Sequence, residues 1–131
     1  MNRNLFAVLL LAATSEAWAQ QGITRLQCDG NFSNFVQNIR DVEVRGGYVE
    51  IRKDSVRVLS IVGFSSPEGT TYRISREYEA NVSFVHPTDE LYYGSLNRLS
   101  GRLQLFHLAE KSGNKLSQIF YGDCRTAKPL F

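Results

Sequence analysis

Apolar and polar residues alternate over short runs throughout this chain, and residues that favour turns separate the runs. Alternation with a period of two places every second side chain on one face of a β-strand, and the β-branched and aromatic residues in these runs favour that conformation. The turn signals recur about every 8–12 residues, which is typical of antiparallel sandwiches and barrels. The pattern predicts an all-β fold, a small antiparallel barrel or sandwich of about seven or eight strands, with at most one short helix around residues 31–39.

Glycine, proline and other turn residues set the expected strand boundaries. Residues 42–45 and 48–52 alternate on either side of Gly46-Gly47, so we expect two strands joined by a tight turn. The remaining strands are expected over residues 56–62, 70–75, 80–84, 91–96, 103–108 and 116–124, with Gly101 and residues 111–115 in hairpin turns.

Residues 1–19 have the layout of a cleaved secretory signal peptide. Arg3 precedes an apolar run, and small residues follow at Ala17 and Ala19. The run is too short to span a membrane, and no later run approaches the roughly 20 apolar residues that a spanning helix needs. We therefore expect residues 20–131 to form one β domain, without a membrane span, in the periplasm or the medium.

The two cysteines of the chain, Cys28 and Cys124, lie near the two ends of the expected domain. An oxidising compartment favours a disulfide between them, and their wide spacing differs from the Cys-x-x-Cys arrangement of redox-active pairs. In the chain-entropy treatment, closing a loop of about 100 residues stabilises a domain by roughly 4.7 kcal/mol. We expect a structural disulfide that fastens the first strand to the last.

The charge and the motifs of the chain exclude several classes of function. The chain carries 15 Lys and Arg against 13 Asp and Glu, and the basic residues are scattered, so no nucleic-acid partner is expected. The two histidines, His86 and His107, are too few for a catalytic zinc site, which normally takes three protein ligands. Asp89 and Glu90 are adjacent and would point to opposite faces of a strand. We expect no catalytic residues, no metal and no cofactor.

Tyrosines beside arginines point to a protein partner, because both residue types are enriched in protein interfaces. Because adjacent strand residues face opposite ways, one of Tyr92 and Tyr93 is expected to look outward. Tyr78 lies close in sequence to Arg73 and Arg76. The sequence indicates no particular small-molecule ligand.

Three short motifs carry a resemblance. They are Cys-Asp-Gly at residues 28–30, Asn-Arg-Leu-Ser-Gly at residues 97–101 and Gly-Asp-Cys-Arg at residues 122–125. In these the chain resembles a group of small exported proteobacterial proteins of unassigned function, which share an Asn-Arg-x-Ser/Thr-Gly turn and a C-terminal cysteine. The resemblance covers mainly the last third of the chain and implies a small β domain without implying a reaction.

Residues 65–72, Ser-Ser-Pro-Glu-Gly-Thr-Thr-Tyr, carry a more distant resemblance. They are similar to the Ser-x-Ser-Gly-x-x-Tyr loop of the periplasmic C-type lysozyme inhibitors, with a proline and a glutamate before the glycine. Those inhibitors are small antiparallel barrels with one cysteine near each end, and their loop enters the lysozyme cleft. The resemblance implies a protein-binding loop with Ser65, Ser66, Gly69 and Tyr72 as its contact residues.

Together these patterns favour an exported, non-enzymatic small β protein that acts as a binding module or supports the cell envelope. The alternative function is inhibition of lysozyme through residues 65–72.

Overall fold

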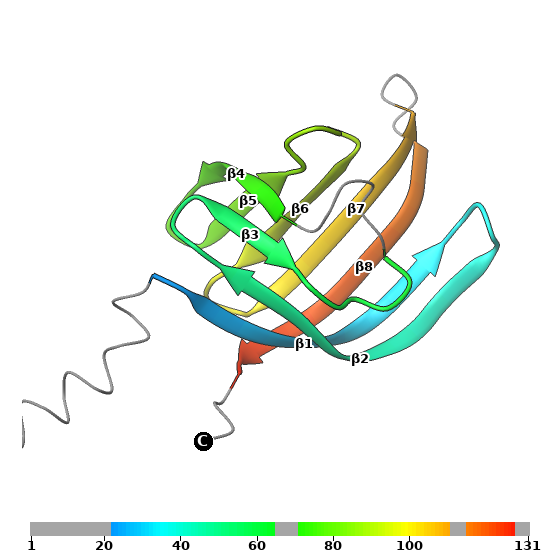
Figure 1. Ribbon diagram of the computed structural model, residues 1–131. Helices are drawn as coiled ribbons and strands as arrows, with labels where there is room; N and C mark the ends of the chain where they lie inside the picture. Colours follow the sequence, from blue (N-terminus) through cyan, green and yellow to red (C-terminus); the bar gives the residue numbers. More distant parts are fainter. Residues whose placement is uncertain (1–21, 65–70, 111–114, 128–131) are drawn as a thin grey trace, which may run out of the picture.

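The structure, a computed structural model, describes residues 22–64, 71–110 and 115–127, and these form a closed eight-stranded antiparallel barrel (Figure 1). Each strand pairs with its neighbours in sequence, and β1 pairs with β8 to close the sheet. The predicted signal peptide, residues 1–19, lies outside the described residues. The strands are β1 (Thr24–Asn34), β2 (Ile39–Ile51), β3 (Ser55–Val58), β4 (Thr71–Glu77), β5 (Asn81–Val85), β6 (Tyr92–Asn97), β7 (Arg102–Glu110) and β8 (Lys115–Thr126).

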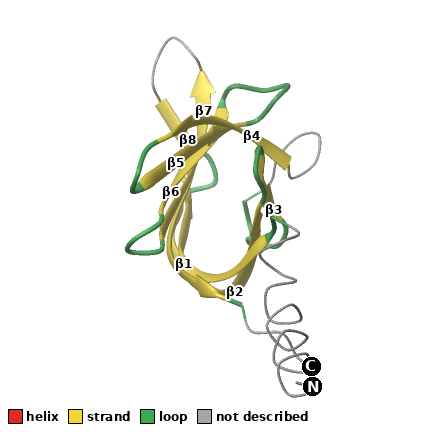
Figure 2. Cartoon of the chain, turned by 90° about the vertical axis from the view of Figure 1, so that its left-hand side faces the viewer, coloured by secondary structure: helices red, strands yellow, loops and turns green. Residues whose placement is uncertain are grey.

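The all-β prediction is confirmed, and the sheet forms a barrel rather than a sandwich. Figure 2 shows the sheet curving from the wall that contains β5, β6 and β8, through β1 and β2, to β3 on the opposite side. Tyr72, Phe84 and Phe120 are fully buried in the hydrophobic core of the barrel. As expected from strand alternation, Tyr92 is buried inside while its neighbour Tyr93 faces outward.

The predicted disulfide is present. Cys28 in β1 and Cys124 in β8 are bonded, and they stand directly opposite each other in the strand register, with 4.0 Å between their Cα atoms. The β1–β8 pair is the seam at which the barrel closes. The bond therefore holds together the two strands at which a barrel of this topology would otherwise begin to open.

The predicted Gly-Gly hairpin is wrong, because β2 continues through this position as one strand. Cys28 pairs with Gly47 and Gly30 pairs with Val44, so β2 has one more residue than β1 over this stretch. This is a β-bulge, which bends a strand and increases its twist. Gly46 has a φ of 69°, the left-handed conformation that glycine adopts at low cost. The two glycines therefore bend β2 around the barrel instead of reversing the chain.

The short helix expected around residues 31–39 does not form. β1 continues to Asn34, a turn follows over residues 35–38, and β2 then begins. The Asn34 side chain accepts a hydrogen bond of 3.1 Å from the backbone N–H of Gln37, and Asn38 has a φ of 56°. Such asparagine side-chain bonds and left-handed residues stabilise turns in preference to helices.

The hairpin predicted around Gly101 is confirmed. Gly101 has a φ of 78°, and the Asn97 side chain accepts hydrogen bonds of 2.9 Å from the backbone N–H groups of both Leu99 and Ser100. The strand expected over residues 56–62 is shorter than predicted and ends at Val58. Residues 111–114 of the next expected turn lie outside the described residues.

The two ends of the barrel differ. The disulfide end carries the start of β1, the end of β8 and the turns at residues 52–54, 78–80 and 98–101. The histidine end carries the turn at residues 35–38, the segment that follows β3, and the connection between β5 and β6 that begins with His86.

Candidate functional site

A cavity of about 470 Å³ opens at the disulfide end of the barrel. Its wall is partly apolar, because Leu26 and Leu96 are buried there and Ile51 and Cys124 are half-buried. No aromatic residue lines the cavity among the residues that the structure describes; its apolar lining is aliphatic, together with Cys124 of the disulfide. The polar residues that line the cavity are Thr24, Asn97, Arg98, Ser100, Arg125 and Thr126.

The turn between β6 and β7 forms one side of the cavity. Gly101 accepts a hydrogen bond of 2.8 Å at its carbonyl oxygen from the backbone N–H of Cys124, which ties the turn to the disulfide. A Cβ atom at Gly101 would lie 2.3 Å from the Cys124 carbonyl oxygen, so the close approach requires glycine. Leu99 lines the cavity although 85% of its surface is exposed. The rim therefore presents an apolar side chain to solvent.

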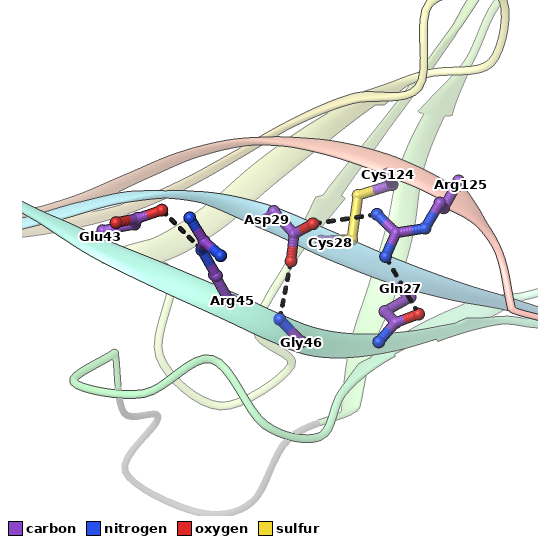
Figure 3. A network of polar contacts seen from close by, with 8 residues as sticks. All are labelled: Gln27, Cys28, Asp29, Glu43, Arg45, Gly46, Cys124 and Arg125. Atoms are coloured by element: carbon purple, nitrogen blue, oxygen red, sulfur yellow. Dashed lines mark hydrogen bonds and ion pairs between the residues drawn. A yellow bond between two sulfur atoms is a disulfide. The ribbon is translucent and has the colours of Figure 1, made fainter.

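Arg125, which also lines the cavity, belongs to a polar network on β1, β2 and β8 (Figure 3). Its guanidinium donates hydrogen bonds of 2.9 Å to the Asp29 carboxylate and 3.3 Å to the Gln27 side-chain oxygen. The other Asp29 oxygen accepts a hydrogen bond of 2.7 Å from the backbone N–H of Gly46. Asp29 thus pairs with the bulge in β2 and with the guanidinium at the rim.

These contacts change the acidity of Asp29. The hydrogen bond from Gly46 and, next, the contact with Arg125 hold the pKa of the Asp29 carboxyl below its ordinary value, because both favour the charged form. Arg45 lies nearby and pairs with Glu43 at 2.7 Å, which raises the pKa of the Arg45 guanidinium. The network is exposed, so its electrostatic effects are screened by salt.

The three motifs behind the first resemblance meet at this end of the barrel. Residues 28–30 pair with residues 122–124 across β1 and β8. Residues 97–101 form the turn whose carbonyl at Gly101 accepts from Cys124. Motifs whose cysteines are 96 positions apart in the sequence therefore build one structural unit around the disulfide.

The predicted protein-binding loop is only partly described. Ser65, Ser66 and Gly69 lie outside the described residues. Tyr72 lies in β4 with no exposed surface, and its ring packs edge-on against Phe84 and His86, with 5.5 Å between centroids in both pairs. Tyr72 is therefore part of the barrel core, and its ring does not form a surface for a partner in this structure.

The two histidines share the histidine end of the interior. The Tyr92 ring stacks on His107 at a centroid distance of 4.0 Å and lies 6.3 Å from the His86 ring. Burial lowers the pKa of His107, although the nearby Asp89 carboxylate opposes that shift. Burial also raises the pKa of the Tyr92 hydroxyl. Within the described residues, no group of three His, Cys, Asp or Glu side chains is placed to hold a metal ion.

No family model, curated protein or solved structure gives a significant match to this chain. In the part of the chain that the structure describes, no helix has the length and apolar character needed to cross a membrane. A small disulfide-bonded barrel is compatible with an exported protein, because disulfides persist in oxidising compartments. The fold and the cavity place the protein among small closed β-barrels with a pocket at the mouth.

Proposed function

We propose that this protein is an exported binding protein and that it takes a small ligand with an apolar body into the cavity at the disulfide end. The cavity itself supports the proposal most directly, because about 470 Å³ lies within the range of small-molecule sites, roughly 300–1,000 Å³. Barrel mouths are among the places where such sites occur. The signal-peptide pattern of residues 1–19 supports export to the periplasm or the medium.

The lining indicates the chemistry of the ligand. Leu26, Leu96 and Leu99 offer an apolar surface, so burying a hydrocarbon or aromatic body there is favourable. Both arginines at the rim already have acidic partners, because Arg98 pairs with Glu77 and Arg125 pairs with Asp29. A strongly anionic ligand would have to compete with these carboxylates. We therefore expect an uncharged polar group on the ligand, bound by amide and hydroxyl side chains of the rim.

Fluorescence titration with the uncharged apolar dye N-phenyl-1-naphthylamine tests this function. Leu99→Asp replaces the exposed apolar side chain at the rim and should weaken dye binding about tenfold, which corresponds to about 1.4 kcal/mol. Val36→Asp is the matched control, because Val36 is also apolar, is 76% exposed and lies at the opposite end of the barrel. Equal weakening by both substitutions, or no dye binding by the unchanged protein, would exclude the cavity as the site.

Lysozyme inhibition is the second candidate function. A closed antiparallel barrel with a disulfide between its first and last strands is the architecture that the resemblance implies, and this observation supports it. Because Tyr72 is buried, we assign the contact to the serines that precede it.

The measurement is lysozyme turnover on bacterial cell walls with micromolar amounts of this protein. Ser66→Ala should relieve the inhibition, whereas Ser60→Ala, at an exposed serine in the same connection between β3 and β4, should not. Unchanged lysozyme turnover in the presence of the unmodified protein would exclude this function.

A further inference from the structure

Three neighbouring hollows lie on the outer face of the sheet, from β5 through β6, β7, β8 and β1 to β2. Their volumes are about 210, 350 and 290 Å³. The first of them shares Asn97 and Ser100 with the rim of the proposed ligand cavity. The first two share Arg102 and Gln104 as lining residues, and the last two share Asn31 and Tyr121. We refer to these connected hollows as the outer groove.

The strand register places a row of hydrogen-bonding side chains along the outer groove. Ser95 pairs with Gln104, Gln104 pairs with Tyr121, and Tyr121 pairs with Asn31. Neighbouring strands lie about 4.8 Å apart, so this row of four residues spans roughly 14 Å. Hydroxyl and amide groups both donate and accept hydrogen bonds, as the hydroxyl groups of a sugar do.

An aromatic strip borders this row. The rings of Tyr93 and Phe106 stack with 5.0 Å between centroids, and Phe106 contacts Tyr121 edge-on at 6.2 Å. Tyr121 lines two of the three hollows and is 47% exposed. An exposed aromatic ring offers a flat apolar surface next to its polar hydroxyl, which matches a molecule that has both apolar and hydroxylated sides.

Charge in the outer groove disfavours a polyanion. Two carboxylates, Asp29 and Asp123, line its middle hollow, and the guanidinium of Arg102 lies 3.9 Å from Asp123. Asp29 is engaged by Arg125 and by the backbone of the bulge. A chain of phosphates or sulfates would bring further negative charge to these carboxylates, whereas a neutral chain would not.

We propose that the outer groove binds a neutral, hydroxyl-rich oligosaccharide. A sugar ring lies against the Tyr121 ring, and the hydroxyl groups of neighbouring sugars bond to Ser95, Gln104 and Asn31. Small β-barrels of the OB-fold type use one face of the sheet to bind oligosaccharides, so the geometry has a physical precedent. The four residues assigned to the sugar do not line the cavity described above, and the site does not depend on a ligand there.

Titration calorimetry of residues 20–131 with cellohexaose, maltohexaose and chitohexaose tests the proposal, and a sulfated heparin hexasaccharide serves as the polyanion. We expect at least one neutral hexasaccharide to bind and heparin not to bind. Tyr121→Ala should weaken binding at least tenfold, and Gln104→Ala should weaken it severalfold. Tyr78→Ala is the matched control, because Tyr78 is 58% exposed and lies in the turn between β4 and β5, outside the groove. The cavity variant Leu99→Asp should bind the sugar as the unmodified protein does.

Three results would overturn the proposal. They are the absence of binding to every neutral hexasaccharide at millimolar concentration, equal weakening by the substitutions at Tyr121 and Tyr78, and preferential binding of heparin. If Tyr121→Ala instead abolished lysozyme inhibition while no sugar bound, the outer groove would be a protein interface. Circular dichroism of Tyr121→Ala checks that the barrel is intact, and Tyr121→Phe, which keeps the ring, should retain most of the affinity.

Discussion

Asp29 on the first strand and Arg125 on the last strand form an ion pair of 2.9 Å beside the disulfide, across the seam that closes the barrel. The same carboxylate accepts from the backbone N–H of Gly46 at the bulge of β2. One exposed side chain therefore links three consecutive strands of the closed sheet, β8, β1 and β2 (Figure 3). Its contacts also orient the guanidinium that lines the cavity.

Asp29→Asn should lower the melting temperature near neutral pH. It should also make the melting temperature depend less on pH in the acid range. The folded protein holds the pKa of Asp29 below its unfolded value of about 3.8. The contribution of this group is therefore present above the unfolded pKa and is lost as pH falls through the lower folded pKa. Thermal unfolding between about pH 2 and pH 6 should show a steeper loss of stability in the unmodified protein than in the variant.

Asp123→Asn is the control for this prediction. Asp123 stands opposite Asp29 in the β1–β8 register, but its ion pair with Arg102 is longer, at 3.9 Å, and its side chain is 79% exposed. Asp123→Asn should therefore change the pH dependence of the melting temperature less than Asp29→Asn does. Identical pH profiles for the two variants would show that the Gly46 and Arg125 contacts do not stabilise the fold through Asp29.

Reduction of the disulfide should destabilise the barrel by about 2–5 kcal/mol, because the bond closes most of the chain into one loop. The two cysteines are 96 positions apart, and they hold the seam strands together. Denaturant unfolding with and without dithiothreitol measures the effect. The Cys28→Ser, Cys124→Ser double variant should match the reduced protein and should not respond to the reductant.

The fold class could be predicted because its signals are local. Alternation along each strand predicts that one of Tyr92 and Tyr93 faces inward and the other outward, whatever the strand pairs with, and the structure has Tyr92 inside. The disulfide could be predicted because the chain offers only two cysteines and its leader pattern points to an oxidising compartment. The Gly46-Gly47 pair shows the limit, because the same dipeptide suits a turn and a bulge, and only the length of β1 opposite it decides between them.

The site depends on register and on volume, which no local pattern encodes. Once Cys28 and Cys124 are paired, the antiparallel register places Gln27 opposite Arg125 and brings Asp29 within reach of that guanidinium. The charged residues beside each cysteine, Asp29 and Arg125, are therefore a sequence signal for this contact. The cavity had no such signal, because it is the space that side chains from several distant strands leave unfilled.

Gly101→Ala should destabilise the protein by about 2–3 kcal/mol, the cost of a strained left-handed residue with an additional clash. The φ of Gly101 is 78°, and a Cβ would lie 2.3 Å from the carbonyl oxygen of Cys124. Gly22→Ala is the matched control, because its φ of 64° is similar and a Cβ there meets no atom within 4 Å. Its cost should be about 1 kcal/mol or less. If the two substitutions lowered the free energy of unfolding in denaturant equally, the contact between the turn and the disulfide would not restrict the residue at position 101.

The imidazole of His107 should titrate below the ordinary value of 6.5, because burial disfavours its charged form. A lowered folded pKa means that the unfolded chain binds more protons at mildly acidic pH, so the protein should lose stability as pH falls below about 6.5. The titration of the His107 Hε1 signal by NMR measures the pKa, and unfolding between pH 7 and pH 5 measures the linked loss of stability.

His107→Phe keeps a ring to stack on Tyr92 and removes the titrating group, so this variant should lose less stability over the same range. In the described residues Nδ1 of His107 is buried without a hydrogen-bond partner, so the substitution sacrifices no hydrogen bond at that atom. A midpoint at or above 6.5, or a steeper acid loss in His107→Phe, would contradict this account of the histidine end.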